Sequence, residues 1–413
     1  MVWNRPGSVH APDVVPASLQ QRDVWLNQQL APASAAYNVL FHYQVDAHVD
    51  AARLSAALTA TVRRHAALRA GFSFNGTDVV QRIAPVADTF VAVGDVSDEA
   101  AAIAFAVTPF DLTTPPLVRA CRYVIAGGAT GIMLALHHLV LDGWSCGVLE
   151  FELQRALGDP ATLGADDDVS YLEYCRVQHA RATDAVAIAA ERSYWDVLFE
   201  LPDRFKPDPL AGSFGPRPAA EHRLPLEAAA VRGIFARAQA ARVTPFTIVF
   251  DAFCRTLAKI TGRSDVLAGV TIAGRTEPAY LNTIGLFARV VPFVYAGGTG
   301  VVDVQSQLWR TQARPVISWD VLFAGEPARA RLASRWPWSI TSVQAMPVPE
   351  LGGATRRLPV PRLDSKAPML LRVDFDDADV RPTFVYQRHL FDGAALDDIA
   401  VAFAAALDVT VAV

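Results

Sequence analysis

The chain has 413 residues, of which 52% are hydrophobic and 19% charged, so it can bury a large core and is not a disordered chain. Its formal net charge of −5, from 37 basic and 42 acidic residues, argues against a nucleic-acid partner. Four cysteines without a C-x-x-C pair argue against a zinc site, and no apolar run approaches the 18 residues of a membrane span. We therefore expect a cytoplasmic protein of two or three domains with reduced thiols.

The first half of the chain alternates predicted helices and strands. Apolar residues at helical spacing predict an amphipathic helix, and two short apolar runs around a glycine pair are typical of a hairpin. The expected elements are a helix at 50–70, strands at 119–125 and 131–136, and helices at 147–157 and 171–195. A polar loop between the last two helices carries three aspartates, residues 166–168, which we interpret as solvated.

The second half repeats this alternation after a break. Residues 201–218 contain five prolines and two glycines, which indicates a linker. The elements expected beyond it are helices at 245–260 and 388–403, and strands at 266–274, 287–294, 369–375 and 383–387. We predict an internally duplicated α/β protein with domains at 1–185 and 186–413. The run from His389 to Gly393 echoes that from His138 to Gly143, one residue shorter.

The segment HHLVLDG, residues 137–143, carries the clearest chemical signal. Successive strand side chains point to opposite faces, so only one of His137 and His138 can face a cavity. An imidazole can accept a proton from an attacking amine or hydroxyl, and Gly143 offers a close-approaching backbone N–H to an oxyanion. Asp142 is expected to pair with a distant arginine and fix the loop. Diverging histidines argue against a metal, and the absence of a phosphate-binding glycine loop argues against a nucleotide cofactor.

HHLVLDGWS resembles the HHxxxDG motif of the condensation domains of nonribosomal peptide synthetases, which have a chloramphenicol-acetyltransferase-like (CAT-like) fold. Further segments resemble this family's motifs in the same order. They are Ser18…Gln21…Trp25, Arg64-His65…Leu68-Arg69, Phe110-Asp111-Leu112…Arg119, Tyr194-Trp195, Gly274-Arg275-Thr276…Ile284-Gly285…Phe287 and Leu390-Phe391-Asp392. The resemblance implies two CAT-like subdomains that form a V-shaped pseudo-dimer, with the active site in the tunnel between them.

The resemblance also implies roles for individual residues. The catalytic pair would be His138, as general base or positioning group, and Gly143, as oxyanion donor. The residues implied to be structural at the active site are His137, Asp142 and Arg275, with Arg275 as the ion-pair partner of Asp142 across the two halves. Three further candidates for substrate binding are Trp144, Ser145 and Arg289. Arg289 stands where the family usually has asparagine, and its fork would suit a carboxylate on the acceptor.

The implied reaction transfers an acyl group from the phosphopantetheine thioester of an acyl or peptidyl carrier protein to a hydroxyl or amine. The carrier would act in trans on a free-standing, monomeric enzyme without a bound cofactor or metal, and the acceptor would be a small molecule or carrier-bound. A thioester is already activated, so the enzyme mainly aligns reactants and excludes water. Departures from the family pattern in the second half favour an ester or another unusual acceptor. The alternatives are an acyl-CoA-dependent acyltransferase of the same fold and a non-catalytic carrier-recruiting domain.

Overall fold

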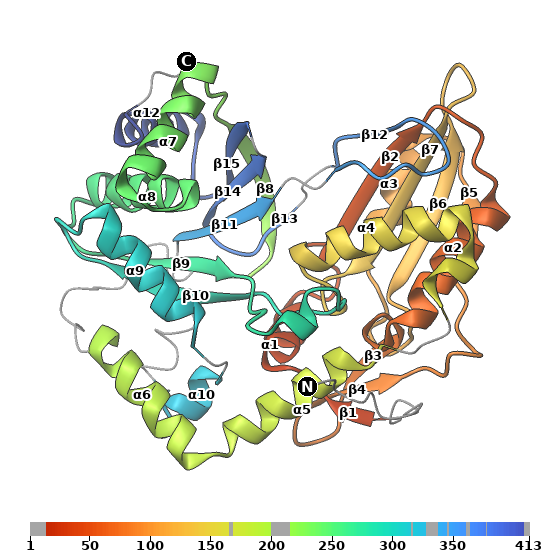
Figure 1. Cartoon of the computed structure of the whole chain (residues 1–413), viewed down its shortest axis with the longest axis horizontal. Coiled ribbons are helices and arrows are strands. Elements are labelled where there is room, and N and C mark those ends of the chain that lie inside the picture. Colours follow the sequence, from red (N-terminus) through yellow and green to blue (C-terminus); the bar gives the residue numbers. More distant parts are fainter. Residues whose placement is uncertain are drawn as a thin grey trace. The chain divides into compact units, whose positions relative to one another are not determined.

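The computed structural model describes residues 14–164, 168–199, 215–314, 317–327, 338–344, 347–360, 364–376 and 378–408 (Figure 1). They divide into two compact units. The first unit is Met1–Ala180 together with two later segments, Arg275–Ala288 and Pro347–Pro361, and the second unit is the rest. The predicted division into 1–185 and 186–413 has one boundary and does not include these two later segments in the first domain. The predicted linker lies mostly outside the described residues, which resume at Gly215.

The first unit is built on a five-stranded sheet in the order β12-β2-β7-β6-β5 (Figure 1). Its strands are β2 (Asn38–Val45), β5 (Val93–Asp95), β6 (Val118–Val124), β7 (Thr130–His137) and β12 (Thr355–Arg357). The antiparallel β6–β7 pair confirms the predicted hairpin. The edge strand β12 comes from the segment Pro347–Pro361, and Arg357 anchors it through both carboxylate oxygens of Glu150 in α4 (Gly143–Gly158). A smaller sheet contains β1 (Val14–Pro16), β4 (Val79–Ile83) and β3 (Ala70–Phe74).

Alternate side chains of β7 enter two different cores, because successive residues of a strand point to opposite faces. Ile132, Leu134 and Leu136 belong to the larger cluster, which includes side chains of α2 (Ala51–Arg64) and α4. Met133 and Ala135 belong to a second cluster with α3 (Glu99–Val107). Helices therefore cover both faces of the sheet, and β7 is buried along its whole length up to His137.

The structure corrects three predicted helices of this part of the chain. The helix expected at 50–70 ends at Arg64, where His65 adopts extended backbone angles before a short 3₁₀ turn. The helix expected at 147–157 begins four residues earlier, because Asp142 caps its first turn. The helix expected at 171–195 is two helices, α5 (Ser170–Ala182) and α6 (Ala185–Phe199). The Asp184 carboxylate caps the second helix by accepting from the N–H groups of Val186 and Ala187.

The aspartate loop is also corrected where it is described. Asp168 is not simply solvated, because its carboxylate lies 3.2 Å from Nδ1 of the buried His65 and accepts the Ser170 N–H. The other ring nitrogen of His65, Nε2, lies 2.7 Å from Glu152 in α4. His65 thus ties the end of α2 to α4 and to the segment before α5. Residues 166 and 167 lie outside the described residues.

The second unit has a seven-stranded sheet in the order β10-β9-β11-β14-β15-β8-β13 (Figure 1). The strands are β8 (Arg217–Arg223), β9 (Val266–Ile272), β10 (Arg289–Tyr295), β11 (Trp338–Gln344), β13 (Asp364–Ser365), β14 (Met369–Asp376) and β15 (Asp379–Gln387). Most pairs are antiparallel, but β11 runs parallel to both β9 and β14. The helices α7 (Ala228–Ala241), α8 (Pro245–Thr261) and α12 (Gly393–Ala406) supply apolar side chains to its core.

One strand–turn–helix occurs in both units with the same spacing. Four residues separate the end of β7 from Asp142, and four separate the end of β15 from Asp392. Each aspartate caps the helix that follows: Asp142 accepts the Ser145 N–H at 2.8 Å, and Asp392 accepts the Ala395 N–H at 2.9 Å. The predicted echo was therefore wrong by one residue, because His389 corresponds to Leu139. Gln387 and Arg388 occupy the positions of the two histidines.

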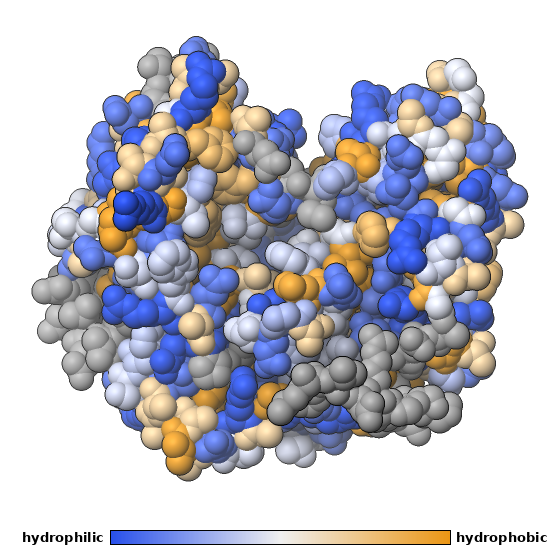
Figure 2. Space-filling model, in the orientation of Figure 1, coloured by the Kyte–Doolittle hydropathy of each residue, from blue (hydrophilic) through white to orange (hydrophobic). Residues whose placement is uncertain are grey.

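The helices of the described part of the chain were compared with the length and hydropathy that a membrane span needs. None of its helices is both long enough and apolar enough to cross a membrane. The face drawn in Figure 2 has small groups of hydrophobic side chains among hydrophilic ones.

Candidate functional site

The turn after β7 determines which nitrogen of His138 is available. The His138 N–H donates to the Tyr37 carbonyl at 2.8 Å, and the ring Nδ1 lies 2.8 Å from the carbonyl oxygen of Leu141. A carbonyl only accepts hydrogen bonds, so Nδ1 must carry the hydrogen. In the neutral ring the lone pair is then on Nε2. His138 is half-buried, whereas its neighbour His137 is fully buried.

His137 has the opposite arrangement. Its Nδ1 accepts the Leu139 N–H at 3.2 Å, and its Nε2 lies 3.4 Å from Oε1 of Gln28. The ring edge packs against Phe110, with ring centres 6.0 Å apart. The ring is thus 1% exposed, and its acceptor nitrogen is occupied by a backbone N–H of the turn itself.

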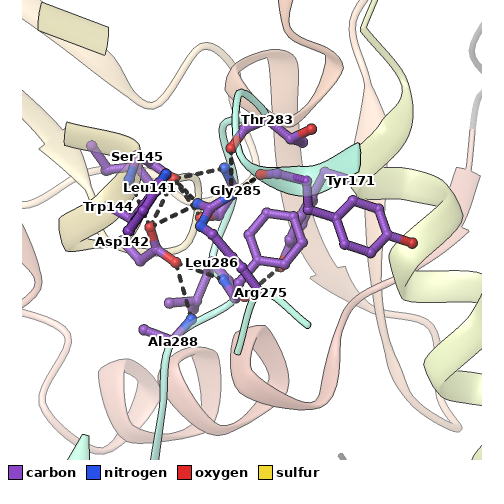
Figure 3. A network of polar contacts seen from close by, with 12 residues as sticks. Leu141, Asp142, Trp144, Ser145, Tyr171, Arg275, Thr283, Gly285, Leu286 and Ala288 are labelled. Carbon is purple, nitrogen blue, oxygen red and sulfur yellow. Dashed lines mark hydrogen bonds and ion pairs between the residues drawn. The ribbon is translucent and has the colours of Figure 1, made fainter. Parts of the chain in front are cut away.

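Asp142 is the centre of a buried polar network (Figure 3). Its Oδ1 accepts from both the backbone N–H and the hydroxyl of Ser145, each at 2.8 Å, and from Arg275 Nη2 at 3.0 Å. Its Oδ2 accepts from the backbone N–H groups of Phe287 and Ala288, both at 3.0 Å. The carboxylate therefore does two tasks: it caps α4, and it anchors the segment Arg275–Ala288 beside the histidine turn.

Arg275 completes this network from the same segment. Its side chain is 2% exposed, and it donates to the Ser145 hydroxyl at 2.8 Å and to the Thr283 carbonyl at 2.8 Å, in addition to Asp142. Its guanidinium also lies 4.1 Å from the ring centre of Phe287. Two buried charges of opposite sign with this many hydrogen bonds are well compensated. The sequence placed this ion pair across the two halves, but the arginine belongs to the first unit.

The three residues that follow Asp142 differ in their exposure to solvent. Ser145 was expected to contact substrate, but it is fully buried and its hydroxyl contacts Asp142, Arg275 and Gly285, so its place is inside the network. Trp144 is half exposed and donates its indole N–H to the Leu281 carbonyl at 2.8 Å. Gly143 is exposed; a Cβ there would meet nothing within 4 Å, and its φ is outside the left-handed region. The fold itself does not require a glycine at this position.

Arg289 belongs to the second unit, where it is the first residue of β10. Its Nη2 donates to the Arg314 carbonyl at 2.7 Å. Part of the guanidinium is therefore used in the scaffold of that unit. Within the described residues, no group of three or more histidine, cysteine or acidic side chains is arranged to hold a metal ion.

Sequence reasoning missed several residues that hold the site. Gln21 donates its amide to the Leu139 carbonyl at 2.9 Å, and the Tyr171 hydroxyl donates to the Leu286 carbonyl at 2.9 Å. Gln21 was noted as part of a motif, but nothing in the motif indicated its contact. The backbone N–H groups of Phe287 and Ala288 carry no sequence signal at all.

Comparisons with solved structures identify the fold. The condensation domain of the monacolin K polyketide synthase MokA superimposes with a TM-score of 0.78 at 21% identity, covering 97% of each chain. The X-domain of teicoplanin biosynthesis, solved in complex with OxyB, has a TM-score of 0.78 at 18% identity and covers 99% of this chain and 96% of its own. Together with the histidine turn, these likenesses define a CAT-like α/β protein.

Sequence comparison then gives the family. The model of the condensation domain matches residues 11–303, and the chain belongs to the condensation-domain family. Chondramide synthase cmdD of Chondromyces crocatus is 32% identical over 300 residues, and phosphinothricin tripeptide synthetase PhsC of Streptomyces viridochromogenes is 31% identical over 301. The matches cover 68% and 67% of this chain but only 8% and 27% of those synthetases. Condensation domains form amide or ester bonds between carrier-bound building blocks in such systems.

Proposed function

We propose that this chain catalyses transfer of an acyl group from the phosphopantetheine thioester of a carrier protein to an amine or hydroxyl acceptor. The observation that carries the proposal is the 2.8 Å contact between His138 Nδ1 and the Leu141 carbonyl. In the neutral ring it puts the hydrogen on Nδ1 and the lone pair on Nε2, and Nε2 is the nitrogen that we propose takes the acceptor's proton.

The chemical step follows from that lone pair. The acceptor nitrogen or oxygen attacks the thioester carbon while His138 Nε2 takes the acceptor's proton. The C–S bond then breaks, and the departing thiolate takes the proton from His138 and leaves as the free thiol. Gly143 begins α4, and the N–H of a first helical residue has no acceptor within its helix. In the proposed step this N–H donates to the oxyanion.

Other residues of the proposed site hold the turn or meet substrate. Asp142, Arg275, Ser145 and His137 are structural, because their polar atoms are buried and bonded to one another or to the turn. The half-exposed Trp144 ring is proposed to line the path of a substrate. We retain Arg289 as a candidate for binding an acceptor carboxylate. Replacement by alanine would then raise the acceptor KM and leave the donor KM unchanged.

Two other functions are compatible with the same fold. Acyl-CoA carries the same pantetheine thioester, so a CoA-dependent transferase would use the same base. A non-catalytic recruiting role is supported by one structural neighbour, the X-domain solved in complex with OxyB. The bonded arrangement of His138, which a recruiting domain would not need, favours catalysis.

The deciding experiment is intact-protein mass spectrometry of an acyl-loaded carrier mixed with the enzyme and separate acceptors: free amines, hydroxy acids and aminoacyl carriers. We expect loss of the acyl mass from the carrier with one acceptor class, and no loss with His138→Ala. Transfer from acyl-CoA alone would replace the carrier by CoA as donor. No transfer by the unmodified enzyme with any acceptor, together with carrier binding, would favour recruitment.

A further inference from the structure

The first helix of the first unit buries glutamines where an amphipathic helix normally buries apolar side chains. In α1 (Leu19–Leu30) the buried residues are Leu19, Gln20, Gln21 and Gln28. Burying an amide is unfavourable unless its polar atoms are hydrogen-bonded. The hydrogen-bond partners of these amides therefore indicate which part of the unit this helix positions.

Gln21 and Gln28 both reach the histidine turn. They are seven residues apart, which places them on one face of the helix, two turns from each other. Gln21 Nε2 donates to the Leu139 carbonyl at 2.9 Å, and its Oε1 accepts the Ser18 N–H at the start of the helix. Gln28 Oε1 lies 3.4 Å from His137 Nε2. One helix thus contacts the residues on both sides of His138.

The surroundings of Gln28 determine which way its amide points. The nitrogen Nε2 lies near three backbone carbonyl oxygens, those of Ala31 at 3.0 Å, Ser34 at 3.1 Å and Pro32 at 3.4 Å. An amide nitrogen only donates, so this end belongs with the carbonyls and the oxygen faces His137.

The two contacts of His137 then require the same protonation state. An amide oxygen beside Nε2 requires a hydrogen on Nε2, and the Leu139 N–H that points at Nδ1 requires a lone pair there. The ring is therefore neutral with its hydrogen on Nε2. A charged ring would place two donors face to face at Nδ1 and push Leu139 away, which would open the turn that orients His138.

We propose that Gln21 and Gln28 are positioning residues for His138: Gln28 holds His137 in its neutral Nε2–H form, and Gln21 holds the Leu139 carbonyl. His138 then keeps its Nδ1–H on the Leu141 carbonyl, with the lone pair of the neutral ring on Nε2. The effect on turnover rests on the proposed function, whereas the tautomers of the two histidines do not.

The test begins with the unmodified protein, labelled with ¹⁵N-histidine and examined by long-range ¹H–¹⁵N NMR at pH 7.5. Signals are assigned by their loss in His137→Asn and His138→Ala. We expect hydrogen on Nε2 of His137 and on Nδ1 of His138. Hydrogen on Nδ1 of His137, or a charged ring, would overturn the inference without any variant of the glutamines.

Gln28→Glu supplies the second arm, because a carboxylate of the same shape beside Nε2 favours the charged imidazolium. We expect His137 to become charged and kcat to fall roughly 10- to 100-fold, part of the contribution of a general base, with the donor KM within about twofold. Gln29→Glu makes the same change on an exposed neighbour and should alter neither quantity. Gln21→Met removes the Leu139 bond together with the contacts of Gln21 Oε1 to the Ser18 N–H and the Cys175 thiol, but leaves the partners of His137 in place. It should lower kcat with His137 still neutral.

The outcomes separate the two proposals. A charged His137 in Gln28→Glu with unchanged kcat in an active enzyme would overturn the positioning role. If the unmodified enzyme transfers no acyl group but shows the expected tautomers, and Gln28→Glu alters both rings, the proposed function fails and the positioning of His138 stands. If Gln28→Glu does not fold, the tautomers of the unmodified protein and the kcat of Gln21→Met decide.

Discussion

Gly285 packs directly against the ring of Tyr171: a Cβ on Gly285 would lie 2.1 Å from the Tyr171 Cδ2. The tyrosine is fully buried, and its hydroxyl is bonded to Leu286, so the ring cannot turn away. We expect Gly285→Ala to lower the free energy of unfolding by about 1–3 kcal/mol in urea denaturation, the usual cost of overpacking. Gly233→Ala, in α7 with nothing within 4 Å, should raise it by up to about 1 kcal/mol. Equal effects of the two changes would contradict the contact.

The buried carboxylate of Asp142 should tolerate even an isosteric change poorly. In Asp142→Asn the amide nitrogen must face either Arg275 or the N–H groups of Phe287 and Ala288, which are all donors. We expect a loss of about 3–5 kcal/mol in the free energy of unfolding, as for a broken buried ion pair.

Asp392 provides the matched control for that change. It caps α12 as Asp142 caps α4, but it is exposed. Asparagine caps helices as well as aspartate, so Asp392→Asn should change stability by less than about 0.5 kcal/mol. A comparable loss in both variants would mean that capping, rather than the network, accounts for the effect.

The His65 contacts predict a pH-dependent stability. Burial alone lowers the pKa of this imidazole, but the hydrogen bonds and charges of Asp168 and Glu152 outweigh it and raise the pKa above its ordinary value. A raised folded pKa means that the contribution is complete below about pH 6.5 and is lost as the pH rises through the folded value. Burial raises the pKa of Asp168, yet its bonds to His65 and Ser170 lower it overall, so its contribution is lost in acid, below about pH 4.

This prediction can be checked by urea unfolding of the unmodified protein and His65→Gln at pH 5.5 and pH 9. The difference in free energy of unfolding should be larger at pH 5.5. The exposed His48 is the control, since His48→Gln should give a small difference at both values. A His65 difference that grows toward pH 9 would show that the buried ring is neutral.

Gly143 should matter for turnover and not for folding. The structure has room for a methyl group at Gly143, so Gly143→Ala should leave the unfolding midpoint unchanged. The change keeps the backbone N–H, but in the proposed reaction the added methyl would crowd the oxyanion and weaken its hydrogen bond to that N–H. Complete loss of one oxyanion donor costs roughly 100- to 1,000-fold in kcat, which is the upper limit of the fall expected here. Gly393→Ala, at the corresponding first position of α12 and equally open, should leave acyl transfer unchanged. Full activity of Gly143→Ala would remove this residue from the mechanism.

Local patterns were sufficient to predict the β6–β7 hairpin, α8 and the histidine turn, because apolar runs and turn residues act over a few positions. The break between α5 and α6 was missed, since Thr183 and Asp184 interrupt an otherwise continuous pattern with a side-chain cap. The alignment of the run at His389 with the run at His138 was wrong by one residue because it matched the two histidines. The number of residues from the end of the strand to the capping aspartate is what the two units share. Contacts made by backbone groups, such as Ala288 N–H to Asp142, depend on the fold and have no signature in the sequence.

The two late segments of the first unit limit where recombination within the gene could produce a folded protein. Arg275–Ala288 brings the partners of Asp142, and Pro347–Pro361 brings the edge strand β12 with the arginine that pairs with Glu150. A recombination event near residue 185 would join an aspartate and a glutamate from one parent to arginines and backbone from another. Recombination between relatives should therefore yield folded chimaeras when both late segments come from the same parent as Met1–Ala180. The first unit is then inherited as a set of three segments.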